Sequence, residues 1–334
     1  MTPAQLAALR DSLPPFADVG LVPAQLQDYC RFYGLDFEAR LPRVHHRIGS
    51  VTAGPYTLAV QCWLQPGASA NLLLVHGYFD HAGLYGKLIE FGLLNNCNVL
   101  IFDLPGHGLS SGEPAVIGDF GDYGLATGAV LEAASPSPDL PLWVMAQSTG
   151  CAALVEYARR GPWPFAATVL LAPLLHPRGW KTGRLLHTLA RPFKTGLKRK
   201  FVANSSDPQF LDFLKRDPLQ SQRLSLAWVS ALKRWLAGLQ LADLGVGPAL
   251  IVQGDADQTV EWRYNIRAYC ELFPHSRIEM LPGAGHHLAN ESEAVRRTYY
   301  SLVGGYIHSA GITRQSSDIL VTQDLPSNAG RDLP

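Results

Sequence analysis

Ser148 is the residue whose surroundings in the sequence are most typical of covalent catalysis. It lies in the pentapeptide AQSTG at residues 146–150, which follows directly on the apolar run at residues 142–145. A serine between small residues, where a strand turns sharply into a helix, is typical of a nucleophile elbow. The turn requires small residues two positions before and two positions after the serine. Gly150 meets this requirement fully, and Ala146 meets it in part. The pattern predicts that the Ser148 hydroxyl attacks an acyl carbon.

The serine needs a general base within hydrogen-bond reach and a third group that orients this base. In a strand-turn-helix setting, the expected order along the chain is Ser, then Asp or Glu, then His. The loop after the apolar run at residues 249–252 contains Asp255 and Asp257. The loop after the next apolar run contains His286 and His287. The residues alone leave the choice within each pair open.

Short apolar runs predict the strands that position these loops. They lie at residues 72–75, 99–102, 142–145, 168–171, 249–252 and 278–281. Nearly continuous apolar strands are buried on both faces, as in a parallel sheet covered by helices. Residues 44–48 and 56–63 predict a leading antiparallel hairpin. The fold class is therefore α/β, a mostly parallel eight-stranded sheet with helices on both faces and chemistry at the carboxyl ends of its strands.

Residues 174–244 contain helix-like stretches and no convincing strand, so we expect an inserted helical cap. The basic residues of its first half are Arg178, Lys181, Arg184, Arg191, Lys194, Lys198, Arg199 and Lys200. They could hold an anionic head group or make transient contact with a membrane surface. A solvated helix whose apolar side packs on the core is the favoured interpretation. Further along, Trp228, Leu232 and Trp235 share a helical face that either lines an acyl pocket or buries the helix.

The two ends of the chain carry weaker signals. Residues 1–42 are expected to form an N-terminal helical extension with an amphipathic helix that begins near Pro23. The apolar residues of this helix are Leu26, Tyr29, Cys30 and Tyr33. Residues 310–334 are rich in Ser, Asn, Asp, Gln and Pro and are expected to form a flexible C-terminal tail.

The composition favours one large domain, and the serine chemistry predicted above needs no cofactor. The chain has 334 residues, of which 47% are hydrophobic, and its formal net charge is zero, so no global field favours nucleic acid. The first residues lack the pattern of a signal peptide, and no run is long enough to span a bilayer, so we expect a cytoplasmic protein. Five scattered cysteines argue against both a disulfide framework and a zinc ribbon.

Four motifs make the chain resemble the α/β-hydrolase superfamily, in particular its monoacylglycerol lipase and lysophospholipase-like branch of serine aminopeptidase-like hydrolases. They are HGYFDH at residues 76–81, DLPGHGLSSG at 103–112, AQSTG at 146–150 and GAGHHLANE at 283–291. The resemblance implies a hydrolase core at residues 43–173 and 245–309 around the cap. It departs at Ala146, where the branch usually has glycine, and one methyl group should crowd the turn without abolishing it.

The resemblance also implies roles for the residues left open above. The family pattern Gly-x-x-Asp-x-x-Val makes Asp257 the acid and Asp255 a structural carboxylate. The pattern Gly-Ala-x-His makes His286 the base and leaves His287 as a neighbour that packs or faces solvent.

Attack by the serine creates an oxyanion that backbone N–H groups must stabilise. The first donor is expected to be Thr149, which begins the helix after the nucleophile. The resemblance implies Tyr78 as the second donor. The other polar residues of the two glycine-rich motifs are expected to brace these loops; they are His76, His81, Asp103 and His107.

Other functions fit the residues less well. His76, Asp80 and His81 approximate the ligand loop of a dinuclear zinc hydrolase, but Tyr78 stands where a second histidine is needed, so no metal is expected. A catalytically silent binding protein with this fold would usually lack part of the triad. A serine aminopeptidase would need acidic cap residues, whereas this cap begins with a basic cluster. Acyl transfer to an alcohol would use the same catalytic residues as ester hydrolysis. We therefore predict a serine esterase for small-molecule ester or lipid substrates such as monoacylglycerols or lysophospholipids.

Overall fold

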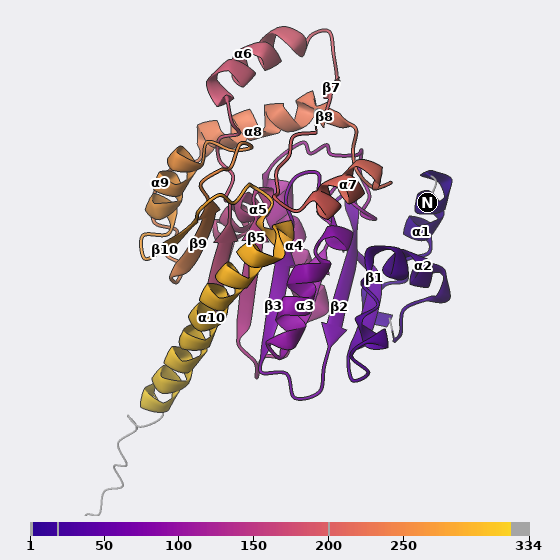
Figure 1. Ribbon diagram of the computed structural model, residues 1–334, viewed down its shortest axis with the longest axis vertical. Coiled ribbons are helices and arrows are strands. Elements are labelled where there is room, and N and C mark those ends of the chain that lie inside the picture. Colours follow the sequence, from indigo (N-terminus) through magenta and orange to yellow (C-terminus); the bar gives the residue numbers. More distant parts are fainter. Residues whose placement is uncertain (1–2, 19, 200, 322–334) are drawn as a thin grey trace, which may run out of the picture.

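The computed structural model describes residues 3–18, 20–199 and 201–321, and an eight-stranded sheet lies at its centre (Figure 1). The strands are β1 (His45–Ala53), β2 (Tyr56–Leu64), β3 (Ala70–Val75), β4 (Cys97–Phe102), β5 (Leu142–Gln147), β6 (Ala167–Leu171), β9 (Ala249–Gly254) and β10 (Arg277–Leu281). Their order in the sheet is β1-β2-β4-β3-β5-β6-β9-β10. Strand β2 is antiparallel to β1 and β4, and all other pairs are parallel. The α/β class, the hairpin and the six apolar strands are thereby confirmed.

Helices cover both faces of the sheet because strand side chains alternate between two hydrophobic cores. In β3, Leu73 and Val75 belong to one core, and Leu72 and Leu74 belong to the other. The first core is covered by α4 (Gly121–Ala134), α5 (Thr149–Ala158) and α9 (Trp262–Leu272), and the second by α3 (Gly86–Leu94) and α10 (Glu293–Val321).

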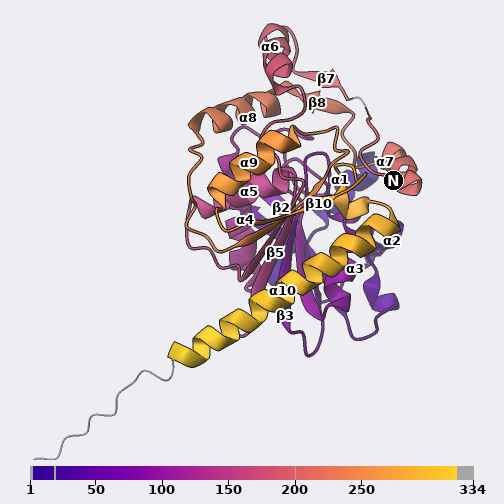
Figure 2. The ribbon, with the colours of Figure 1, turned by 60° about the vertical axis from the view of Figure 1, so that its left-hand side comes forward.

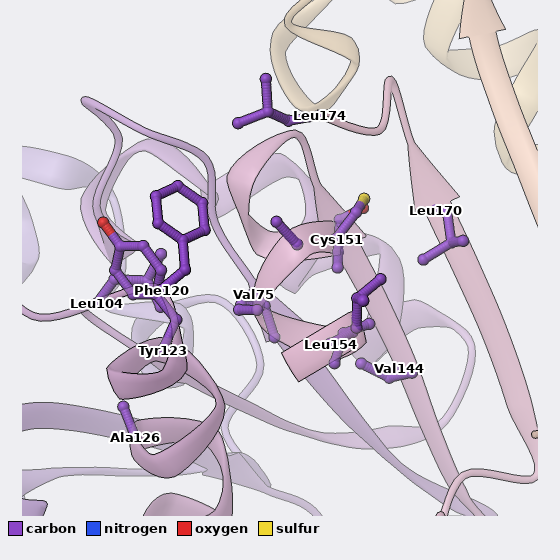
Figure 3. Packing of buried hydrophobic residues seen from close by; sticks show 14 of the residues in the cluster. Val75, Leu104, Phe120, Tyr123, Ala126, Val144, Cys151, Leu154, Leu170 and Leu174 are labelled. Atoms are coloured by element: carbon purple, nitrogen blue, oxygen red, sulfur yellow. The ribbon is translucent and has the colours of Figure 1, made fainter. Parts of the chain in front are cut away.

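Figure 3 shows the first core, where Leu154 of α5 lies beside Val144 of β5. This packing holds the start of α5 close to the end of β5, and Ser148 is the residue between the two elements.

The N-terminal extension contains α1 (Pro3–Asp11) and α2 (Ala24–Tyr33), with short 3-10 helices at Phe16–Asp18 and Phe37–Ala39. Helix α2 begins after Pro23 and is capped at its C-terminus by Gly34, whose φ of 65° suits glycine. Its predicted apolar residues are buried in the second core, which confirms the amphipathic helix. Two more 3-10 helices lie at Ala82–Leu84 and Leu288–Asn290.

The segment predicted as a cap lies above the carboxyl ends of the parallel strands (Figures 1 and 2). Its helices are α6 (Trp180–Ala190), α7 (Pro208–Arg216) and α8 (Leu226–Gly238). A small antiparallel pair, β7 (Gly196–Lys198) and β8 (Arg223–Ser225), joins them. The sequence did not predict this pair, since three-residue strands carry almost no periodicity.

Helix α6 packs on the first core only through Trp180 at its start, so the favoured interpretation that its apolar side packs on the core is wrong for its leucines. Leu185, Leu186 and Leu189 are 62%, 59% and 62% exposed, and Phe193 beyond the helix is 85% exposed. Polar contacts from His187 hold the helix to α8. Because α6 lies on the outer side of α8 (Figure 1), no other element of the described chain covers its leucines.

Helix α10 continues past residue 309, where the sequence predicted a flexible tail, and ends at Val321. No proline, which would break or kink the helix, occurs in residues 293–321. Its C-terminal part extends away from the sheet (Figure 2). Residues 322–334 of the predicted tail lie outside the described residues. No helix in the described part of the chain is both long and apolar enough to cross a membrane.

Candidate active site

Ser148 occupies the turn between β5 and α5. Its φ of 53° and ψ of −113° are unusual for a residue with a side chain. Its backbone N–H donates to the Leu171 carbonyl oxygen over 2.9 Å, which ties the turn to β6. A Cβ on Gly150 would lie 2.3 Å from the Val75 carbonyl oxygen, so this position requires glycine. The turn forms with Ala146 at its first small position.

The structure brings Ser148, His286 and Asp257 together from loops that follow β5, β10 and β9. His286 Nε2 lies 3.0 Å from Ser148 Oγ, and His286 Nδ1 lies 2.7 Å from Asp257 Oδ2. The three residues are only 7%, 5% and 1% exposed, respectively. This arrangement can activate a hydroxyl group for attack on an acyl carbon.

The two candidate acids have different surroundings. Asp257 Oδ1 accepts the backbone N–H groups of Thr259 and Val260 at 2.7 and 3.2 Å, while its Oδ2 faces the imidazole. Asp255 is exposed, and its Oδ1 accepts the Gly283 N–H over 2.7 Å. The structure therefore places Asp257, and not Asp255, beside the histidine.

Burial and charge act in opposite directions on the buried pair. Burial disfavours the imidazolium, but the charge of Asp257 and its hydrogen bond outweigh burial and raise the pKa of His286. Burial also disfavours the carboxylate, but the charge of His286 and several hydrogen bonds hold the pKa of Asp257 below its usual value. Asp257 can therefore stay ionised and stabilise an imidazolium during catalysis.

Close backbone approaches join the acid loop, the base loop and the cap. A Cβ on Gly254 would lie 2.3 Å from the Ala284 carbonyl oxygen and 2.4 Å from that of Gly285. Buried Glu291 accepts the Gly285 N–H over 2.6 Å and the Ser206 N–H over 2.9 Å. Sequence reasoning gave Glu291 no role, although its place in the GAGHHLANE motif was a usable signal.

Tyr78 and Thr149 supply N–H groups from the two segments that flank Ser148. Tyr78 lies in the loop at residues 76–81, called the β3 loop below, and Thr149 is the first residue of α5. A Cβ on Gly77 would lie 3.3 Å from Ser148 Cβ, so the β3 loop passes close beside the serine. Among the described residues, neither N–H has a protein acceptor. Two such N–H groups can stabilise a developing oxyanion.

Polar residues of the β3 loop and of the turn after β4 form structural contacts. His76 Nε2 accepts the Leu104 N–H over 2.8 Å, and His81 Nε2 lies 2.8 Å from Asp217 Oδ2. Asp103 accepts two backbone N–H groups, both at 2.7 Å. His76, His81 and Asp103 therefore each bond to a different partner. No group of three or more His, Cys, Asp or Glu side chains in the described chain could hold a metal ion.

His287 bonds across to the β3 loop instead of to the serine. Its Nε2 lies 3.2 Å from Asp80 Oδ1, and Asp80 Oδ2 accepts the Tyr85 hydroxyl over 3.1 Å. Burial opposes ionisation of Asp80, but the charge of His287 keeps the pKa of Asp80 below its usual value. The sequence does not show which loop lies opposite His287, so this pair was not predicted. His107 is also buried and bonds within its own turn.

The shared face of Trp228, Leu232 and Trp235 points inward, with exposed fractions of 4%, 0% and 7%. The Trp228 ring stacks on Tyr78 with 4.0 Å between ring centroids, and the Trp235 ring stacks on Phe120 at 5.0 Å. This face therefore buries α8, and Trp228 also covers the β3 loop beside the serine.

A mostly parallel eight-stranded sheet with a serine after β5, an acid after β9 and a histidine after β10 defines an α/β-hydrolase. Within this class, the chain belongs to the serine aminopeptidase family S33, whose profile matches residues 66–293.

Relatives of the chain include lipases. It is 27% identical to a monoglyceride lipase homolog of monkeypox virus, over 69% of this chain and 86% of that protein. It is 28% identical to a monoacylglycerol lipase of Mycolicibacterium smegmatis, over 66% of this chain and 82% of that protein. The crystal structure of a soluble variant of monoglyceride lipase from Saccharomyces cerevisiae, in complex with a substrate analog, has a TM-score of 0.66 at 17% identity and covers 78% of this chain and 94% of that one. That structure supports the fold.

Proposed function

We propose that the chain is a serine hydrolase that cleaves carboxylic esters, with Ser148 as nucleophile, His286 as general base and Asp257 as the acid that orients the base. The observation that carries this proposal is the hydrogen-bonded series from Ser148 Oγ through the imidazole to Asp257, at 3.0 and 2.7 Å. Membership of the S33 family supports the same reaction class.

The reaction proceeds through an acyl-enzyme. His286 removes the Ser148 proton as Oγ attacks the carbonyl carbon, and the π electrons move onto the carbonyl oxygen. The N–H groups of Tyr78 and Thr149 stabilise this oxyanion, each by about a hundredfold to a thousandfold in rate. His286 then protonates the leaving alcohol as the ester C–O bond breaks. A water molecule that His286 deprotonates then attacks the acyl carbon. The bond from this carbon to Ser148 Oγ breaks, His286 returns the proton to Oγ, and the acid leaves, while Asp257 stays ionised throughout.

Lipid-like esters such as monoacylglycerols or lysophospholipids are the proposed substrates, since relatives of the chain are named as monoglyceride lipases. Aminopeptidase activity needs a free carboxylate that binds an α-ammonium group. Three of the buried carboxylates, those of Asp80, Asp217 and Asp257, are each paired with a histidine and are not free to bind such a group, which supports ester substrates. Acyl transfer to an alcohol would use the same residues and is the alternative reaction.

A rate series over glycerol esters of increasing acyl length, with neutral and phosphate-bearing head groups, tests the substrate class. We expect kcat/KM to rise by up to about fourfold for each buried methylene, until the acyl site is filled. An aminoacyl anilide serves as the control for peptidase activity and should not be cleaved. Loss of activity beyond short acyl chains would remove the lipid proposal, and equal rates for both head groups would remove a head-group role for the basic cap.

We also propose that the cap makes transient contact with an anionic membrane surface. The exposed residues Leu185, Leu189 and Phe193 present apolar groups to solvent, and exposed cations flank them. These cations are Lys181, Arg184, Arg191, Lys194 and Lys198. An apolar helix face bordered by cations is suited to the head-group region of an anionic bilayer. Arg199 does not belong to this surface, because its guanidinium lies 3.9 Å from the centre of the Phe79 ring. Lys200 lies outside the described residues.

Vesicle sedimentation tests this contact. The chain should bind phosphatidylcholine vesicles that contain phosphatidylglycerol more tightly than vesicles of phosphatidylcholine alone. The double change Leu189→Ser with Phe193→Ser should weaken binding by about tenfold or more, because two apolar side chains no longer enter the interface. Leu94→Ser, at a 72% exposed leucine that ends α3, is the matched control and should bind as the wild type. Equal binding by both variants would contradict the proposed surface. The cytoplasmic location stays a prediction.

A further inference from the structure

The cap contacts the β3 loop at three successive places. The Tyr78 ring stacks on Trp228 of α8. One residue further, the Phe79 carbonyl oxygen accepts Nε2 of Gln220 over 2.8 Å. His81 Nε2 lies 2.8 Å from Asp217 Oδ2. The loop that supplies one oxyanion donor is therefore held from the cap side as well as from the sheet.

Phe79 has a backbone conformation that must be held in place. Its φ is 69°, in the left-handed region that side chains other than glycine rarely adopt. Relaxation of this φ would turn the peptide groups on both sides of Phe79. Its neighbour Tyr78 carries the N–H group that is the proposed second oxyanion donor. This N–H belongs to the Gly77–Tyr78 peptide, which is joined to the Tyr78–Phe79 peptide through the Tyr78 Cα, so movement at Phe79 is transmitted to it.

Gln220 is built into this contact. It is 6% exposed, and its Oε1 accepts an Arg199 N–H over 2.5 Å, so its amide nitrogen must face the Phe79 carbonyl oxygen. The guanidinium of Arg199 also lies over the Phe79 ring. Two cap residues therefore hold the main chain and the side chain of the same strained residue.

Asp217 extends the contact to the N-terminal extension. Its carboxylate and the His81 ring are both fully buried, and Oδ1 accepts the Tyr33 hydroxyl of α2 over 2.6 Å. The Gly83 N–H donates to His81 Nδ1, so the proton on His81 Nε2 points to the carboxylate. Gln220 Nε2 lies 3.3 Å from Asp217 Oδ2 as well. Carboxylate, imidazole and amide form one buried network.

We propose that Gln220 and Asp217 are positioning residues of the oxyanion hole, which is complete only when the cap is seated on the β3 loop. They do not touch the substrate. They hold Phe79 and His81 so that the Tyr78 N–H points at the acyl oxygen. This proposal rests on the proposed esterase function, and it makes the cap part of the catalytic apparatus as well as a cover.

Gln220→Met tests the proposal, because it keeps the side-chain length and removes the N–H donor. We expect kcat to fall about 10- to 100-fold with KM changed by less than about twofold. An alkyl trifluoromethyl ketone provides a second readout. Its carbonyl carbon bonds to Ser148 Oγ, the serine proton passes to His286, and the hemiketal oxygen becomes an oxyanion. Its Ki should rise by the same factor as kcat/KM falls.

Gln209→Met is the matched control, since Gln209 is an exposed glutamine on α7, and it should leave kcat, Ki and the melting temperature unchanged. A purely structural role for Gln220 predicts a lower melting temperature with unchanged kcat and Ki at a temperature well below unfolding, and that result would overturn the proposal. If Gln220→Met does not fold, Arg199→Met tests the same contact and should lower kcat and raise Ki in parallel. Ser148→Ala separates the two hypotheses, because activity retained there would end the proposed function itself.

Discussion

Ser148→Ala should lower kcat for ester hydrolysis by about 10⁴-fold or more, because no other group in the site can form the acyl-enzyme. His286 would then have no hydroxyl to deprotonate at the 3.0 Å contact that now joins it to Ser148 Oγ. Folding should be preserved, since alanine keeps the Cβ that already occupies the strained turn with φ of 53°. Steady-state kinetics and the melting temperature together measure these two effects.

Labelling by a fluorophosphonate gives the decisive control for this variant. The wild type should react, and Ser148→Ala should not. Ser137→Ala, at an exposed serine in the loop before β5 and therefore at the other end of that strand from Ser148, should keep both activity and labelling. If purified Ser148→Ala retained most of the esterase activity, the assignment of the nucleophile would be wrong.

The sheet and the order of the site loops could be predicted from the sequence because their signals are local. The six apolar runs match β3, β4, β5, β6, β9 and β10, which pair in parallel. The expected burial on both faces is wrong for β10, an edge strand in which Ile278 and Met280 are exposed. A nucleophile elbow needs glycine for a reason visible in the structure, namely the 2.3 Å approach of Val75 to the site of a Gly150 Cβ. Patterns of this kind depend on residues that are neighbours in the chain, so a single sequence is enough to recognise them.

Contacts between distant segments could not be predicted in the same way. The amphipathic pattern of α6 showed an apolar face, but it did not show that Leu185 and Leu189 would be left exposed. The links from Glu291 to Ser206 and from Gln220 to Phe79 join residues 85 and 141 positions apart, respectively. Their partners are fixed only when the cap has packed on the sheet. Asp255 and Asp257 illustrate the same limit, since both follow β9 and only tertiary geometry places one of them at the base.

Asp257→Asn should lower kcat/KM by about 10⁴-fold, whereas Asp255→Asn should change it by less than about threefold. The difference lies in the direction that an amide must adopt. Oδ1 of Asp257 accepts two backbone N–H groups, so the carbonyl oxygen of the introduced amide would be drawn to that position and its NH₂ group would face His286 Nδ1. An NH₂ group donates to Nδ1 and leaves the proton on Nε2, where the imidazole cannot accept the serine proton.

The pH dependence of kcat/KM checks this mechanism independently of its magnitude. Neutral His286 is the active form, and Asp257 raises its pKa, so wild-type activity should fall as the pH drops through a pKa above the usual value of 6.5. Removal of the carboxylate charge should move this acid limb to lower pH for the residual activity of Asp257→Asn. Asp255→Asn should keep the wild-type limb, because Asp255 bonds to the Gly283 N–H and not to the imidazole. The assignment of the acid would be reversed if Asp255→Asn lost more kcat/KM than Asp257→Asn. It would also be reversed if the acid limb of the pH profile shifted in Asp255→Asn and not in Asp257→Asn.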